Sequence, residues 1–269
     1  MKTKLNLSTL LALSTAVFVL FTNPCANATL YDLSTAPLTG VTLPDGSIFQ
    51  INDPQTSTGT GVINPFLSIQ NNGSEQGYNT NAGDFDTKRN GQYTTDLMVG
   101  DLKLASNNIS YVSFLIDVNQ LNSTPGNKIS LDRLMIWTSP TPMSSSSVDV
   151  NGNFNGSLGT LLYNLDSTTN GGASNSVLYV DGLSGSGSGD IRFFVPRAIF
   201  AGLPLGDYIY MYQQWGTTPG YETNGGFEET LSFGTIVIPE ATSLIPLGLV
   251  LATGIALHYL RRRGIPAIA

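Results

Sequence analysis

Alternating hydrophobic and polar positions dominate the central part of the chain and predict β-strands. The clearest case is residues 109–118, where every second residue from Val112 to Val118 is large and apolar and falls on one face of an extended segment. A turn rich in Pro, Gly and Asn follows, so we expect residues 128–138 to pair with this segment as the next strand. The alternation shifts near Arg133, which predicts a β-bulge there.

Further short apolar runs, separated by clusters of Gly, Asn, Ser, Thr and Pro, extend this pattern on both sides. They predict strands at 47–52, 62–70, 92–99, 159–165, 176–180, 190–196, 207–215 and 230–238. Residues 196–203 are compatible with one helical turn. About ten strands favour an all-β class, with a single ectodomain of the β-sandwich or jelly-roll type.

The first residues have the layout of a secretory signal peptide. Two lysines precede an apolar core that ends at Phe21, and Ala26 and Ala28 form an A-x-A cleavage pattern. We therefore predict a signal peptide at 1–28 that is cleaved after Ala28. A retained membrane anchor is the alternative, and the short apolar core argues against it.

A second apolar segment lies near the other end, where residues 243–260 carry no full charge. A helix of this length spans about 27 Å, close to the hydrocarbon thickness of a bilayer, so we predict a transmembrane helix. Arg261, Arg262 and Arg263 follow at once. Arginine clusters stay on the cytoplasmic side of a membrane, which places the body of the protein outside.

Pro239, Glu240 and Ala241, the apolar helix and the arginine cluster together resemble the PEP-CTERM sorting signal of bacteria, with Ala241 where proline is usual. The resemblance covers residues 237–269. It implies that the tag is held transiently in the inner membrane and cut near the Pro-Glu motif by an exosortase-like enzyme. The body then passes to the cell surface or extracellular matrix. A single-pass protein that stays anchored is the alternative.

The body between the two signals, residues 29–236, carries seven basic and eighteen acidic residues, a net charge of −11. Such a charge repels phosphate backbones, so we expect no nucleic-acid partner. The body also lacks Cys and His, which excludes disulfides, Ser–His–Asp triads, cysteine nucleophiles and Cys/His zinc sites. Hydrolysis by two carboxylates and oxygen-only calcium sites remain open.

Three tyrosines alternate along the segment 207–215. Tyr208, Tyr210 and Tyr212 share one face, the apolar residues between them share the other, and Trp215 follows at the end. If the apolar residues face the core, the aromatic rings line an outer face that suits contact with the sugar rings of an exopolysaccharide. Ordinary cross-strand pairing of good strand residues is the competing explanation.

One loop has the spacing of a calcium site. Asp149, Asn151 and Asn153 occupy alternate positions, but neither possible frame completes an EF-hand. An Asn-Gly turn between strands explains the same residues. We expect no cofactor, and calcium is the one metal that the sequence leaves open.

Glu228 and Glu229, with Glu222 nearby, provide carboxylates for a secreted carbohydrate-active enzyme, although no spacing singles out a pair. The alternative is a protein without catalytic residues. The sequence favours this second hypothesis, an exported, non-catalytic surface or matrix protein that contacts exopolysaccharide.

Overall fold

The computed structural model describes residues 28–36, 40–52, 64–83, 85–88, 90–102, 104, 110–121, 125–143, 159–172, 174–181 and 189–236. The rest of the predicted signal peptide, the calcium-like loop and the sorting segment 237–269 lie outside these residues. Within them the protein is all-β, with short 3-10 helices η1 (Val99–Leu102), η3 (Thr168–Asn170) and η4 (Arg197–Phe200). No helix of the described part is long and apolar enough to cross a membrane.

Seven strands form the first sheet. Its main path runs through β1 (Leu30–Asp32), β11 (Ser176–Val180), β9 (Lys128–Ser139), β13 (Tyr208–Trp215) and β6 (Glu75–Tyr78). Two further strands flank it, β10 (Thr160–Asn164) beside β9 and β7 (Leu97–Met98) beside β13. Only the β1–β11 pair of this sheet is parallel among the described strands.

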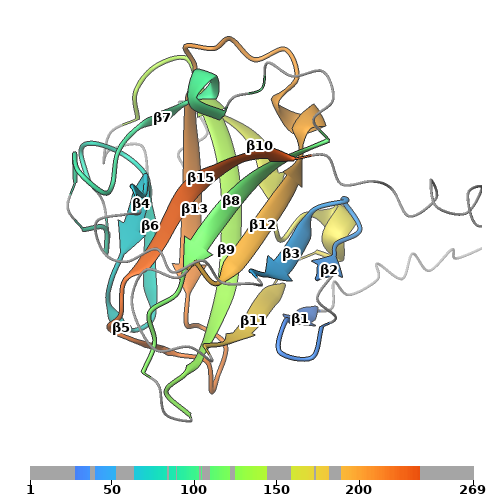
Figure 1. Ribbon diagram of the computed structural model, residues 1–269, viewed down its shortest axis with the longest axis vertical. Helices are drawn as coiled ribbons and strands as arrows, with labels where there is room; N and C mark the ends of the chain where they lie inside the picture. The colour runs from blue at the N-terminus through green and yellow to red at the C-terminus, as the bar shows by residue number, and fades with distance from the viewer. Residues whose placement is uncertain are drawn as a thin grey trace, which may run out of the picture.

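Six strands form the second sheet, in the order β2 (Val41–Thr42), β3 (Ile48–Ile51), β12 (Ile191–Pro196), β8 (Tyr111–Asp117), β15 (Glu228–Ile236) and β4 (Leu67–Ile69). A small ladder of β14 (Thr223–Asn224) and β5 (Asn72–Gly73) lies apart from both. Figure 1 shows β15, β8 and β12 of the second sheet crossing in front of β13 and β9 of the first. The arrangement is sandwich-like.

The main core lies between the two sheets. The Phe193 ring of β12 stacks on Phe49 with centroids 4.7 Å apart and lies 6.1 Å from Phe114, both in its own sheet. Tyr163 of β10 approaches from the facing sheet, with its ring centroid 5.2 Å from that of Phe193. All four side chains are buried, so these contacts join the sheets through apolar surface removed from water.

Most of the expected strands are present. The alternation of β8 is confirmed, since Val112, Phe114, Ile116 and Val118 all belong to the main core. The bulge near Arg133 is confirmed as well: Gln214 pairs with Arg133 and the next residue, Trp215, pairs with Leu131. The turn expected at 196–203 is η4.

The expected pairing of β8 with β9 is wrong. β8 pairs with β12 and β15, while β9 pairs with β10, β11 and β13 in the other sheet. The two segments are consecutive strands that face each other across the core. Both faces of β8 are buried, because Leu115 and Ser113 on its outer side are as inaccessible as its core residues.

Replacing Phe193 with alanine tests the contact between the sheets. We expect the free energy of unfolding to fall by about 3–5 kcal/mol, because the change removes a buried ring and leaves a cavity between the layers. Urea denaturation of the variant measures the loss. The matched control is Leu205→Ala, since Leu205 is 69% exposed and its truncation creates no cavity. Equal stability of the two variants would contradict this account of the core.

Candidate functional site

The tyrosine face of β13 is covered. Tyr210 and Tyr212 are fully buried, and Tyr208 is half-buried. The Tyr210 hydroxyl accepts a hydrogen bond from the backbone N–H of Met143 (2.8 Å), and the Tyr212 hydroxyl donates to Gln76 Oε1 (2.7 Å). The predicted exposed platform for sugar rings is therefore wrong, since these rings serve packing.

Part of that prediction is nevertheless confirmed. Ile209 and Met211 face the main core, and Tyr208, Tyr210 and Tyr212 belong to a separate cluster on the other side of the sheet. Trp215 lies beyond the bulge and points into the core, where its indole N–H donates to Gln213 Oε1 (3.1 Å). The alternation gave the correct faces, but it contained no information on what covers the outer one.

The acids considered for catalysis do not form a pair. Glu228 is fully buried between the sheets, whereas Glu222 is exposed. Glu229 is half-buried and accepts a hydrogen bond from Ser68 Oγ (3.3 Å). Neighbouring residues of a strand point to opposite faces, which separates Glu228 from Glu229.

Glu228 has a partner that the sequence did not indicate. Its carboxyl group lies beside that of Glu75, which comes from β6 in the other sheet, and each carboxyl group affects the pKa of the other. Gln120 Nε2 donates to Glu228 Oε1 (2.6 Å), and the backbone N–H of Asn71 donates to Glu75 Oε2 (2.7 Å). The remaining oxygens, Glu75 Oε1 and Glu228 Oε2, are buried and accept no hydrogen bond from the described residues. A proton bound to one carboxyl group would allow it to donate to the other.

Burial favours the protonated form of this pair. Desolvation, followed by the adjacent Glu75 carboxyl group, raises the pKa of Glu228 well above its usual range. A proton retained in this way can join the two sheets through a carboxylic acid–carboxylate hydrogen bond. Neither of the two hollows described below is lined by Glu75 or Glu228.

A second acid is buried at the end of β8. Asp190 accepts hydrogen bonds from the Val118 backbone N–H (2.7 Å) and the Tyr179 hydroxyl (3.1 Å). Burial, followed by the charges of Asp117 and Asp181, raises the pKa of Asp190 to about 8. The described residues contain no group of three or more Asp, Glu, His or Cys arranged to hold a metal ion.

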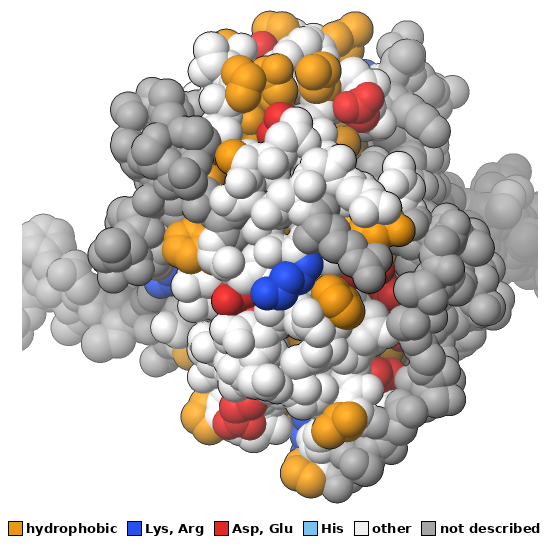
Figure 2. Space-filling view, turned by 90° about the vertical axis from the view of Figure 1, so that its left-hand side faces the viewer, with side chains coloured by type: hydrophobic (Ala, Val, Ile, Leu, Met, Phe, Trp, Pro, Cys, Tyr) orange, Lys and Arg blue, Asp and Glu red, His pale blue; other side chains and the backbone are white. Residues whose placement is uncertain are grey.

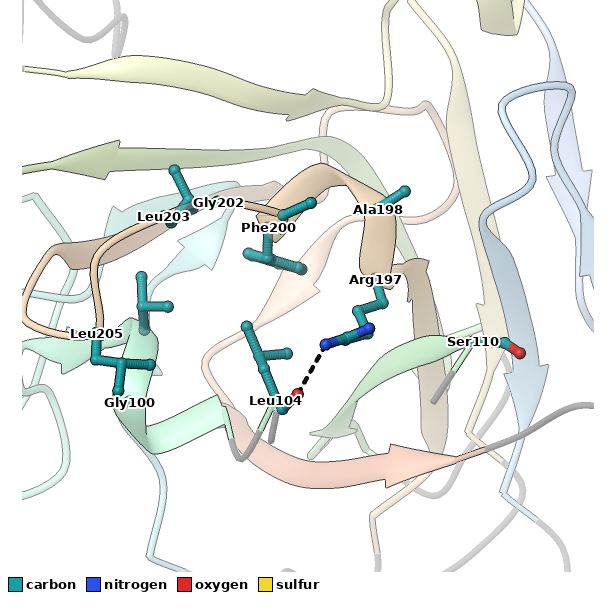
Figure 3. A pocket seen from close by; sticks show the side chains of 11 residues that line it. Gly100, Leu104, Ser110, Arg197, Ala198, Phe200, Gly202, Leu203 and Leu205 are labelled. Atoms are coloured by element: carbon teal, nitrogen blue, oxygen red, sulfur yellow. Dashed lines mark hydrogen bonds between the residues drawn. The ribbon is translucent and has the colours of Figure 1, made fainter. Parts of the chain in front are cut away.

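An apolar hollow of about 680 Å³ lies between η1 and η4 (Figure 3). Its walls include Val99, Phe200 and Leu203, and Arg197 crosses one side to donate from Nη2 to the backbone oxygen of Leu104 (2.9 Å). Figure 2 shows hydrophobic side chains gathering at this end of the molecule, where Leu205 is exposed. Arg197 is thus engaged in holding two segments together, and the remaining lining is chiefly apolar.

A polar hollow of about 410 Å³ lies at the other end of β13, on the outer face of the first sheet. Its walls include Leu30, Arg133, Asp166, Gln214, Thr217 and Pro219. The bulge in β9 builds its floor. Because Asp132 is the extra residue opposite the step from Gln214 to Trp215, Asp132 and Arg133 both turn to the outer face.

Asp132 fixes this floor through four hydrogen bonds. Its carboxylate accepts from Ser130 Oγ (2.7 Å), Ser176 Oγ (2.8 Å), Thr218 Oγ1 (2.6 Å) and the Thr217 backbone N–H (2.6 Å). These bonds tie β9 to β11 and to the loop after β13. Asp132 is a framework residue with both oxygens engaged, which leaves Arg133 as the side chain that the bulge presents. The shifted alternation near Arg133 was the sequence signal for this site.

Comparison with known proteins finds no matching family model, no matching curated protein and no matching solved structure. The functional interpretation therefore rests on the chain itself.

Lowering the pH should increase the free energy of unfolding of the folded body. Burial raises the pKa values of Glu228, Glu75 and Asp190, so the folded chain binds their protons more tightly than the unfolded chain. This stabilisation is complete below the pKa of an unfolded carboxyl group, about 4, and is lost as pH rises through the folded values. We expect the free energy of unfolding to fall between about pH 5 and about pH 8, by about 1.4 kcal/mol per pH unit for each proton involved.

The variant Glu228→Gln assigns part of this slope to the buried pair. Its amide keeps a donor for Glu75 but cannot titrate, so the pH dependence should become shallower. Glu222→Gln is the matched control because Glu222 is exposed, and it should leave the slope unchanged. Urea denaturation at constant ionic strength measures all three proteins. A wild-type stability that increases over this pH range would overturn the interpretation.

Proposed function

We propose that the chain is an exported, non-catalytic protein of the cell surface or extracellular matrix, delivered by its two ends. The signal peptide at 1–28 directs export. The segment around Pro239, Glu240 and Ala241, with the helix at 243–260 and the arginine tail, is a sorting tag for an exosortase-like membrane enzyme. Both ends are assigned from sequence features outside the described strands and helices.

The observation that carries this proposal is where the hydrogen-bonded body begins. The backbone N–H of Thr29 donates to Asn175 Oδ1 (3.1 Å), and the Thr29 carbonyl accepts from the Ser176 backbone N–H (3.0 Å). β1 starts at the next residue and pairs with β11. Cleavage after Ala28 would therefore leave these bonds intact.

The other boundary supports the same division. The last strand, β15, ends at Ile236, three residues before the Pro-Glu motif. Its pairing with β8 continues to that end, with Ile236 opposite Tyr111. A cut near Glu240 would leave the described β15–β8 ladder intact.

The buried position of Glu228 argues against the alternative of an enzyme with paired carboxylates. A glycoside-hydrolysing pair needs a substrate-sized opening between two carboxyl groups about 5 Å or more apart. Glu228 is instead fully buried beside the Glu75 carboxyl group. Its environment suits a structural acid.

Intact-mass measurement of the protein from its native host, separately in membrane and extracellular fractions, tests the proposal. We expect an extracellular form that begins at Thr29 and lacks everything beyond about Glu240. Changing Pro239 and Glu240 to alanine should leave uncut protein in the membrane, because the cleavage motif is lost. The matched control is the single change Glu222→Ala at an exposed site of the body, which should be processed normally.

A different result would identify the alternative. A single membrane-bound form that begins at Thr29 and still ends at Ala269 would mean that the helix is a permanent anchor. The proposal of sorting by cleavage would then fail.

A further inference from the structure

The polar hollow beside the β9 bulge presents polar and charged side chains that the packing of the fold does not require. It does not involve the sorting tag, and its framework is rigid because Asp132 holds β9, β11 and the loop after β13 in one hydrogen-bonded unit. A rigid frame of this kind is what a binding site needs, since ligand contacts then cost little ordering of the protein. Its volume of about 410 Å³ is within the range of small-molecule sites.

Arg133 supplies an unused set of donors in this hollow. Its guanidinium group is half-buried, lines the hollow and donates no hydrogen bond to the described residues. The side-chain amide of Gln214, directly across the ladder from Arg133, is likewise without a hydrogen bond to the described residues. Two neighbouring side chains thus offer donors and an acceptor to whatever occupies the hollow.

Asp166 supplies an acceptor on the facing wall. Its Oδ1 accepts a hydrogen bond from the Asn175 backbone N–H (2.8 Å), which orients the carboxyl group. Burial raises the pKa of Asp166, and the charge of Arg133 opposes this shift, so the two groups interact electrostatically. A cation and an anion therefore both line the hollow.

This pairing of charges selects a class of ligand. One guanidinium and two carboxylates, Asp132 and Asp166, line the hollow, and the body as a whole has a net charge of −11, so anions are repelled. A hydroxyl group both donates and accepts, so adjacent hydroxyl groups satisfy Arg133 and Asp166 together. Leu30 and Pro219 add apolar surface at the rim for the C–H groups of a ring.

We propose that the polar hollow binds a neutral saccharide, with Arg133 donating to one ring hydroxyl, Asp166 accepting from another, and Gln214 fixing the orientation. The inference deepens the proposed surface function by naming a ligand class, and it depends on that function only for its biological setting. Saccharide binding is a property of the body and is measured on the isolated chain, so its failure and a failure of sorting are separate results.

A glycan array that carries neutral and acidic oligosaccharides, probed with the full chain purified in detergent, provides the first test. We expect binding confined to neutral glycans. Calorimetry with the best neutral hit then compares the wild-type chain with Arg133→Gln and Asp166→Asn. Each variant should weaken binding by about tenfold or more, because each removes a charge-assisted hydrogen bond to the sugar.

Two further variants keep the result interpretable. Arg192→Gln is the matched control, since it removes one arginine from β12 in the opposite sheet, and it should bind as the wild type does. Gln214→Ala removes an amide without a hydrogen bond to the described residues, so it should keep the wild-type melting temperature and still weaken binding. If Arg133→Gln does not fold, the affinity of Gln214→Ala decides whether the hollow binds the saccharide.

Three outcomes would overturn the proposal. The first is the absence of any neutral glycan that binds. The second is binding restricted to acidic glycans, which would assign the hollow to a different ligand class. The third is equal affinity of the wild type, Arg133→Gln and Gln214→Ala, which would place the sugar on another surface.

Discussion

The ring of Phe193 packs against Phe49 and Phe114 in its own sheet and against Tyr163 from the facing sheet. Because the body contains no cysteine, no disulfide maintains the relation between the sheets if this packing is lost. β9 and β13 rest on the same core with their inner faces. The position of everything on their outer faces, including the tyrosine cluster and the polar hollow, follows from this burial.

The interface between the sheets is also unusually polar toward the end where β13 finishes. Gln213 of β13 donates from Nε2 to Thr230 Oγ1 of β15 (2.9 Å). Glu75 of the first sheet and Glu228 of the second sheet also face each other across this interface. Buried polar groups of this kind cost free energy unless every donor and acceptor is used. Glu75 Oε1 and Glu228 Oε2 accept no hydrogen bond from the described residues, and burial raises the pKa values of both acids, so the interior favours acidic over alkaline surroundings.

Much of the fold was accessible from the sequence because local patterns control it. Period-two alternation located β8 and β13, and the interrupted alternation near Arg133 located the bulge that builds the polar hollow. Strand partners were not accessible, since pairing joins residues far apart in the chain. The turn between β8 and β9 is compatible with a hairpin and equally with a crossing to the other sheet.

The candidate site shows the same division. Arg133 was marked by its pattern, whereas Asp166 carries no local signal and joins it only through the tertiary fold. The burial of Tyr210 was likewise invisible, because alternation assigns a face and gives no indication of its cover. Glu75 lies in a short polar strand that no hydrophobic pattern announces, so the pair with Glu228 required the structure.

The hydrogen bond from Thr29 to Asn175 has a consequence for the precision of maturation. Asn175 is fully buried, and its amide also donates to the carbonyl groups of Leu165, Asn170 and Gly172, so it anchors the turn before β11. A signal peptidase that cut one residue too late would remove the group that binds Asn175 Oδ1 and leave a buried acceptor empty. In the proposed mature protein, the new amino-terminal residue, Thr29, would also hold the turn before β11 in place. Imprecise cleavage would therefore lower the free energy of unfolding.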